Sequence, residues 1–392
     1  MKARGRDPDR LGSCFGNRKV ISMGHRQSPI VGQNKLKLGF FSPNCSSGMS
    51  VTKVAERWRN TWENNIRLAQ LADAAGIEFL LPIARWIGYG GETDFHGSVL
   101  ETITWATGLL AHTKRVNIFA TVHTAFIHPV VAAKQLATAD MLGAGRLGLN
   151  VVAGWNKPEY DAFGVELPQE HTARYALAQE WFDVVRKIWS HEGPFDWNGE
   201  FYKLKGVYGF PRPYDGVPPV MNAAGSREGR QFATRNADFL FCISVDPEQS
   251  RQEVIDIRDQ AKSQGRSTGV FTLSHVVCRP TVEEAQEYLH WYADENADWA
   301  AVDNLMRLQG MHAQSFPAEA LQMLRGRFAA GHGTLPLIGD PDTIARELAR
   351  ISAAGFAGCT LSFVDYVKEF PYFRDEVLPR LERMGLRHPV AG

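Results

Sequence analysis

Eight short apolar segments alternate along the chain with segments whose apolar residues recur at helical spacing. Apolar runs of this length, bounded by glycine, proline or polar residues, are typical of buried strands, and parallel strands are joined by helices. We expect strands at residues 36–43, 77–82, 116–121, 147–152, 219–224, 239–244, 270–278 and 359–364. This pattern predicts an α/β fold, a (β/α)8 TIM barrel. An open doubly wound sheet is the alternative, because it uses the same alternation.

The segments between these strands carry residues that favour helix ends. Pro129 and Pro341 stand where a first helical turn tolerates proline, Asp340 is a candidate N-cap, and Gly76 and Gly355 follow last turns. We expect helices at residues 62–75, 99–112, 129–142, 175–189, 247–264, 340–354 and 372–384, with another beginning near residue 226. Glu101 would then lie inside the second helix.

Two stretches depart from the alternation. Residues 283–335 are too long for a simple strand-to-helix connection, so we interpret them as an insertion over the barrel mouth, helical at 284–293 and otherwise a lid. Residues 1–33 mix basic residues with glycine, proline and serine and lack the apolar core of a signal peptide. We interpret them as a disordered tail, or as upstream sequence with Met23 as the start. Residues 34–392 would form one domain.

The composition excludes several classes of function. The chain has 43 basic and 43 acidic side chains, so no net field favours nucleic acid or an anionic membrane. No apolar run approaches the roughly 18 residues of a membrane span. The five cysteines are scattered and include no CxxC pair, and the 12 histidines show no metal-ligand spacing. These features predict a cytoplasmic protein with free thiols and no metal site.

Candidate site residues gather where the predicted strands end, because ligands of parallel α/β folds bind at that edge. The segment GRLGLNVVAGWNKPEY places Asn150 inside a buried strand and Glu159 in the polar stretch that follows it. We interpret this strand as the wall of a site. The alternative is an ordinary core strand whose asparagine bonds to neighbouring backbone.

A second candidate is Ala224-Gly225-Ser226, which ends the fifth strand and enters a helix. Free backbone N–H groups and a hydroxyl at a positive helix end suit a phosphate, and Arg174 could supply the opposing charge. A plain serine N-cap is the alternative. No catalytic acid and base stand out, since Glu101, His123 and His128 have structural explanations. A bound cofactor would therefore carry the chemistry.

The chain resembles the bacterial luciferase-like superfamily of reduced-flavin-dependent monooxygenases. The resemblance rests on segments in order from about residue 35 to 385: LAQLADAAGIEF, LLAHTKRVNIFATV, HPVVAAKQLATADMLGAGRLGLNVVAGWNKPEYDAFG, HTARYALAQEWFDVVRKIW, AAGSREGRQFA and IGDPDTIARELARISAAGFAGCTLSF. Within the superfamily, it is most similar to the pyrimidine monooxygenases of uracil degradation, followed by the dimethyl sulfone and alkanesulfonate monooxygenases. The resemblance also implies a TIM barrel.

The resemblance implies roles for particular positions. It assigns contacts with flavin mononucleotide (FMN) to Ile83, Ala84, Asn150, Glu159, Arg174, Tyr175 and Ser226. Thr121 and Asn150 would be the catalytic residues, holding O2 beside flavin N5. The pyrimidine enzymes have Ile-Lys where this chain has Ile83-Ala84, and the neighbouring Arg85-Trp86-Ile87 makes the pocket bulkier. These differences leave the identity of the substrate open.

The activity implied is a two-component monooxygenase. A partner reductase would use NAD(P)H to supply FMNH2, which reacts with O2, through a flavin N5-peroxide, on a small electron-poor substrate. Candidate substrates are a pyrimidine-like heterocycle, an organosulfur compound, or a halogenated or nitro-aromatic. The enzyme would be a homo-oligomer, a dimer or a tetramer. The alternatives are an F420-dependent dehydrogenase on the same barrel and a non-catalytic flavin-binding protein.

Overall fold

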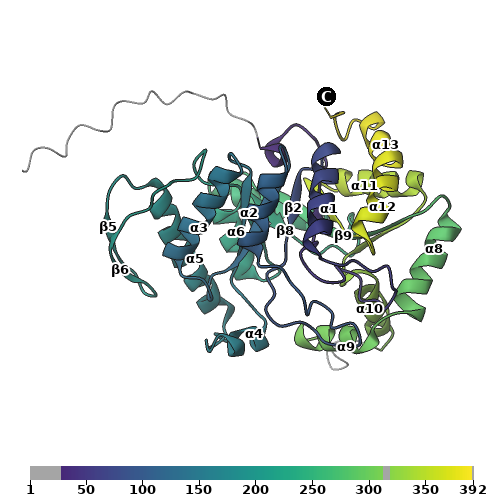
Figure 1. Ribbon diagram of the computed structural model, residues 1–392, viewed down its shortest axis with the longest axis horizontal. Coiled ribbons are helices and arrows are strands. Elements are labelled where there is room, and N and C mark those ends of the chain that lie inside the picture. Colours follow the sequence, from purple (N-terminus) through teal and green to yellow (C-terminus); the bar gives the residue numbers. More distant parts are fainter. Residues whose placement is uncertain (1–27, 312–317, 391–392) are drawn as a thin grey trace, which may run out of the picture.

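Eight parallel strands form a closed barrel in the computed structural model, which describes residues 28–311 and 318–390 (Figure 1). The strands follow the chain around the barrel, and the pairing of β8 with β9 closes it. They are β1 (Lys37–Phe41), β2 (Phe79–Leu81), β3 (Asn117–His123), β4 (Leu147–Val152), β7 (Val220–Ala223), β8 (Phe239–Phe241), β9 (Gly269–Cys278) and β11 (Gly358–Leu361). The TIM barrel is confirmed, and the open sheet is wrong.

Helices cover the outside of the barrel between successive strands. They are α1 (Trp62–Ala74), α2 (Thr102–His112), α3 (Pro129–Leu142), α5 (His171–Ser190), α6 (Arg227–Asn236), α7 (Arg251–Ser263), α11 (Pro341–Ala353), α12 (Tyr366–Glu376) and α13 (Leu378–Arg383). Asp340 caps α11 as predicted, its side chain accepting from the Thr343 N–H. Glu101 was placed inside a helix wrongly, because its carboxylate is the N-cap of α2 and accepts from Ile103 and Thr104.

Phenylalanine rings fill the barrel interior. Phe79, Phe119, Phe241 and Phe271 pack together with fully buried Ile30. Glycines make room for two of these rings: a Cβ at Gly39 would lie 2.4 Å from the Phe79 ring, and one at Gly148 2.3 Å from Phe119. The interior is therefore a packed core, and a ligand site has to lie at an end of the barrel.

Ile30 corrects the boundary predicted for the N-terminal tail. Residues 28–33 belong to the barrel, since the short 3-10 turn η2 (Pro29–Val31) carries Ile30 into the interior. The Ser28 hydroxyl and the Ile30 N–H both donate to Oδ1 of Asn117, the first residue of β3. Residues 1–27 of the predicted tail, with Met23, lie outside the described residues.

Several elements were absent from the sequence prediction. An antiparallel hairpin, β5 (Phe195–Asn198) and β6 (Lys203–Val207), projects from the left of the barrel in Figure 1. The short helix α4 (Lys157–Ala162) follows β4, and β10 (Leu335–Gly339) pairs with the outer half of β9. Among the described residues, no helix is long and apolar enough to span a membrane.

The insertion of residues 283–335 is mainly helical. It contains most of α8 (Val282–His290), the π-helical turn η3 (Trp291–Glu295), α9 (Trp299–Leu308) and α10 (Ala318–Gly331). Figure 1 shows α9 and α4 along the lower edge of the molecule, at the opposite end from η2 and the C-terminus. The lower end is the one toward which the barrel strands run, so the insertion lies at the end where TIM-barrel ligands bind.

Candidate active site

A cavity of about 660 Å³, which we call the mouth cavity, lies at the C-terminal ends of the barrel strands. Its wall includes residues at or near the ends of seven strands: Phe41, Leu81, Thr121, Asn150, Val152, Ala223, Phe241 and Leu273. Leu308, Gln309, Gly310 and His332 line it from the insertion. The insertion therefore contributes to the cavity, as a lid over the barrel mouth would.

Thr121 and Asn150, the two predicted catalytic residues, stand opposite each other in the register of β3 and β4. The Asn150 amide donates to the Thr121 hydroxyl across 3.2 Å, and this hydroxyl donates to the Pro82 carbonyl at 2.6 Å. Asn150 Oδ1 is buried and has no hydrogen-bond partner among the residues that the structure describes. A buried acceptor on a cavity wall is costly unless a ligand satisfies it, so the geometry is compatible with the predicted ligand contact of Asn150.

Ile83 and Ala84 follow β2 and form one side of the mouth cavity. Asn44 holds this segment in place: Oδ1 accepts from the Ile83 N–H at 3.0 Å, and Nδ2 donates to the Ile83 carbonyl at 2.8 Å. The sequence placed Asn44 at a strand end without indicating this role. These two hydrogen bonds fix the backbone of Ile83, which any flat ligand in the cavity would contact.

Arg85 and Glu159 form a buried ion pair beside the cavity. Arg85 Nη1 lies 2.9 Å from Glu159 Oε1, and the two side chains are 6% and 2% exposed. The same oxygen accepts from the Trp86 N–H at 2.8 Å. The Arg85 guanidinium lies over the rings of Tyr89 and Trp155, 5.1 and 5.3 Å from their centroids. The Glu159 carboxylate thus positions Arg85 and Trp86.

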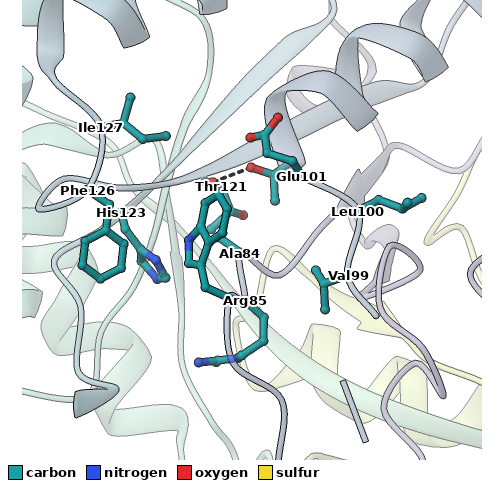
Figure 2. A pocket seen from close by; sticks show the side chains of 11 residues that line it. Ala84, Arg85, Val99, Leu100, Glu101, Thr121, His123, Phe126 and Ile127 are labelled. Atoms are coloured by element: carbon teal, nitrogen blue, oxygen red, sulfur yellow. Dashed lines mark hydrogen bonds between the residues drawn. The ribbon is translucent and has the colours of Figure 1, made fainter. Parts of the chain in front are cut away.

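A side pocket of about 50 Å³ adjoins the mouth cavity and shares four of its residues, Ala84, Arg85, Thr121 and His123 (Figure 2). Its remaining wall is mostly apolar: Trp86, Val99, Leu100, Glu101, Thr102, Phe126 and Ile127. The Thr102 hydroxyl donates to the Thr121 carbonyl at 2.6 Å, which fixes the backbone between the two spaces.

Two histidines line the mouth cavity, and both are neutral. Burial, helped by the positive charge of Arg85, lowers the pKa of His123 and of His332 to about 3. His332 lies in the insertion, and no sequence pattern indicated a site residue at that position. A neutral imidazole at pH 7 can donate or accept a hydrogen bond but is a weak base here. Among the described residues that line it, the cavity therefore has no strong acid–base pair.

The predicted phosphate cradle is the N-terminus of α6. Ser226 caps the helix and accepts from the Gly229 N–H at 3.1 Å. Tyr175 is brought against it: a Cβ at Gly229 would lie 2.4 Å from the tyrosine hydroxyl. Burial raises the pKa of Tyr175 to about 12, although hydrogen bonds with Ser226 and Asn222 oppose the rise. Two hydroxyls therefore meet at a positive helix end.

Arg174 has other partners. Its Nε donates to the Pro168 carbonyl at 2.6 Å and its Nη2 to the Gln169 carbonyl at 2.9 Å. These bonds hold the guanidinium against its own loop, next to Tyr175 in the chain. The structure thus brings Tyr175 and Ser226 together and leaves Arg174 beside them, bonded to backbone.

The site fits a flavin nucleotide. The mouth cavity has a largely apolar wall, and the Asn150 Oδ1 acceptor on it has no partner among the described residues, which suits the polar edge of a flat heterocycle. Ala223 lines the cavity and Ser226 follows it by three residues, so a chain carrying a phosphate could run from the cavity to α6. A Cβ at Gly225 would meet nothing within 4 Å, which leaves the approach to α6 open. Among the described residues, no group of histidine, cysteine or carboxylate side chains could hold a metal ion.

The sequence profile described as luciferase-like monooxygenase matches residues 36–358. The chain belongs to the luciferase-like monooxygenase family. Family members similar to it include the FMNH2-dependent dimethylsulfone monooxygenase of Pseudomonas fluorescens (strain Pf0-1), 31% identical, with 90% of this chain and 96% of the relative aligned. Another is the pyrimidine monooxygenase RutA of Enterobacter sp. (strain 638), 29% identical, with 88% and 96% aligned.

The fold agrees with solved members of the luciferase-like family. The crystal structure of DmoA from Hyphomicrobium sulfonivorans superimposes with a TM-score of 0.81 at 21% identity and covers 92% of this chain and 91% of its own. The sequence prediction of a luciferase-like monooxygenase is therefore confirmed at the level of the family and the fold. The roles assigned to individual residues, the interpretation of residues 1–27 as a tail or as upstream sequence, the oligomeric state and the cytoplasmic location stay predictions.

Proposed function

We propose that this chain is an FMNH2- and O2-dependent monooxygenase that oxidises a small organic molecule, with the reduced flavin supplied by a separate NAD(P)H-dependent reductase. The observation that carries the proposal is the pair of Thr121 and Asn150 on the wall of the mouth cavity, with Asn150 Oδ1 unpartnered. The name of the dimethylsulfone relative, which specifies FMNH2, supports the cofactor. We also propose that this chain and its reductase form a two-component system, and that the chain works as a homo-oligomer.

Each predicted contact has a place in this proposal. Ile83 and Ala84, held by Asn44, would lie against the flavin, and Asn150 would hydrogen-bond to it. Tyr175 and Ser226 would hold the phosphate at α6, with Arg174 alongside. Glu159 acts through Arg85 and the Trp86 N–H. Reduced FMN, when bound, supplies the two electrons with which O2 is activated.

The protein's own contribution is positional. The Thr121 hydroxyl donates to Pro82 and accepts from Asn150, so its hydrogen and one lone pair are engaged in the protein, and Thr121 lines the mouth cavity. Neutral His123 and His332 leave the cavity without a strong base. Residues of the insertion restrict solvent at the mouth, which protects a reactive oxygen species from water. We therefore assign Thr121 and Asn150 to the oxygen chemistry that was predicted beside flavin N5.

The decisive experiment measures O2 uptake and product formation with FMNH2 delivered by an unrelated flavin reductase. The substrate panel contains uracil, dimethyl sulfone, an alkanesulfonate, a chlorophenol and a nitroarene. We expect at least one to give product in proportion to the protein, above the O2 uptake of free FMNH2. Background uptake with every substrate would contradict the proposal, and substrate-dependent reduction of F420 without O2 would indicate a dehydrogenase.

A further inference from the structure

Arg85 has more hydrogen-bonding capacity than the protein uses. A guanidinium has five N–H donors, and the one bond found for Arg85 among the described residues runs from Nη1 to Glu159. The side chain is only 6% exposed, and its Nε is buried without a partner among the described residues. Arg85 lines both the mouth cavity and the side pocket. Its remaining donors therefore border the space in which a substrate would lie.

The guanidinium is also rigidly held. The Glu159 carboxylate bonds it from one side, and the Tyr89 and Trp155 rings lie 5.1 and 5.3 Å from its central carbon. Such packing restricts the rotamers of a side chain that otherwise loses much entropy when it binds a ligand. A donor group fixed before the ligand arrives can select ligands by the position of their acceptor atoms.

The charges around Arg85 decide which acceptor it suits. Glu159 already balances its positive charge, and His123 and His332 are neutral. The other charged side chain that lines either space, among the described residues, is Glu101, which is acidic and caps α2. An anionic substrate would add a negative charge to a buried region that has no free cation to balance it. A neutral acceptor would use the spare donors at no such cost.

We propose that Arg85 is the residue that recognises the substrate, and that the substrate is an uncharged molecule bound through a carbonyl, sulfonyl or nitro oxygen. This inference rests on the proposed monooxygenase function and narrows its substrate class. Sulfonates and carboxylates are excluded as preferred substrates. A small apolar group of the substrate would occupy the side pocket beside Thr121.

The test compares matched neutral and anionic probes on the full-length protein loaded with oxidised FMN. The pairs are dimethyl sulfone with methanesulfonate, uracil with orotate, and nitrobenzene with benzoate, titrated by calorimetry. We expect the neutral member of at least one pair to bind at least tenfold more tightly than its anion. Equal or tighter binding of the anion in every pair overturns the proposal, and so does a lack of binding by all neutral probes.

Two variants test the residue. Arg85→Lys keeps the charge and removes the planar donors, so we expect at least a tenfold loss for the neutral probe. Glu159→Gln removes the balancing charge and should shift the preference toward the anion by at least tenfold. Unchanged neutral affinity in R85K overturns the proposal. A loss of FMN affinity without a loss of probe affinity does the same, because Arg85 would then serve the flavin.

A matched control is Arg279→Lys. Arg279 also pairs with a glutamate, Glu369, at 2.9 Å, and lies 4.0 Å from the Tyr288 ring centroid, but it lines neither space. We expect R279K to leave the probe preference unchanged. The titration needs no turnover, so it separates this inference from the proposed function. If the wild-type protein binds FMN but none of the neutral probes, only the inference about Arg85 is contradicted. Protein that binds no FMN contradicts the proposed function.

Discussion

Asn150 donates a hydrogen bond to Thr121 across 3.2 Å, at positions paired between β3 and β4, and the Thr121 hydroxyl donates a hydrogen bond to the Pro82 carbonyl. The direction of these hydrogen bonds follows from the donors. Because the one hydroxyl hydrogen of Thr121 points to the Pro82 carbonyl, the threonine oxygen can only accept from Asn150. The Asn150 amide is thereby oriented with Oδ1 away from Thr121, and this oxygen is the one left without a partner.

Removing the Thr121 hydroxyl should lower product formation more than flavin binding. In Thr121→Val the side chain keeps its shape but no longer orients Asn150, and a buried donor or acceptor left unsatisfied costs about 1–3 kcal/mol. We expect product per FMNH2 to fall by about tenfold to a hundredfold, with the FMN dissociation constant changed by less than about threefold. Thr121→Ser, which keeps the hydroxyl, is the matched control. Wild-type product yield in T121V would remove Thr121 from the oxygen chemistry.

Ser226→Ala should weaken FMN binding through the phosphate. The variant loses a hydroxyl at the N-terminus of α6, so we expect the FMN dissociation constant to rise by about tenfold, from roughly 1.4 kcal/mol of lost interaction. Riboflavin lacks the phosphate and should bind the variant and the wild type alike. Arg174→Ala added to Ser226→Ala should weaken FMN further if Arg174 reaches the phosphate when FMN is bound.

The control for Ser226→Ala is another N-cap. Thr281 caps α8 and accepts from the Glu284 N–H at 3.1 Å, outside the mouth cavity. Thr281→Ala should cost a similar amount of helix stability, about 1 kcal/mol, without changing the affinity for FMN. Equal losses of FMN and riboflavin affinity in S226A would place the phosphate elsewhere.

The sequence predicted the barrel because its strands are buried on both faces and so appear as continuous apolar runs. The elements it missed lack that signature. The hairpin strands β5 and β6 are short and largely exposed, and β10 has the apolar sequence LPLIG but lies at the end of the insertion, where no strand was expected. Ile30 was assigned to the tail because nothing around it is apolar enough to indicate burial.

The part of the candidate site that lies on the barrel strands was predictable in its position. Thr121 and Asn150 meet because both stand near the ends of adjacent parallel strands, which the alternation indicates. The pairing of Arg85 with Glu159 was not predictable, since it joins two loops 74 residues apart whose conformations the sequence does not indicate. Arg174 shows the same limit: its position beside Tyr175 was clear, but its bonds to the Pro168 and Gln169 carbonyls depend on the loop.

Buried histidines should make the protein sensitive to acid. The pKa of His123, His275 and His332 is lowered to about 3 by burial, from 6.5. Their contribution to stability is complete above pH 6.5 and is lost as the pH falls toward 3, at roughly 1.4 kcal/mol per pH unit for each. Asp140 acts oppositely: burial raises its pKa to about 6, so its contribution is lost as the pH rises from 3.8 through 6.

His275→Gln tests this balance. His275 bonds to the Thr334 hydroxyl at 3.0 Å and lines neither the mouth cavity nor the side pocket. Burial also lowers the pKa of His96, so four buried histidines contribute among the described residues. We expect the loss of unfolding free energy between pH 6.5 and 5 to shrink by about a quarter of the histidine contribution, measured by urea denaturation. The same slope in H275Q and the wild type would contradict the role of burial.

Arg387 and Glu78 lock the C-terminal segment to the N-terminal end of the barrel. Arg387 Nη1 lies 2.8 Å from Glu78 Oε2, with side chains 4% and 2% exposed, and Nη2 donates to the Gly76 carbonyl at 2.7 Å. Arg387→Ala leaves the Glu78 carboxylate buried without its cation, so we expect a loss of about 3–5 kcal/mol in the free energy of unfolding.

Neutralising both partners separates the charge from the packing. Arg387→Met with Glu78→Gln removes the uncompensated charge, and we expect it to recover part of the stability that Arg387→Ala loses. Arg374→Ala breaks the exposed pair with Asp375 and should cost less than about 1 kcal/mol. Urea denaturation at pH 7 measures all three. If Arg387→Ala costs no more than Arg374→Ala, the buried pair is not what holds the C-terminal segment, and the packing of Leu386 and Leu381 has to account for it.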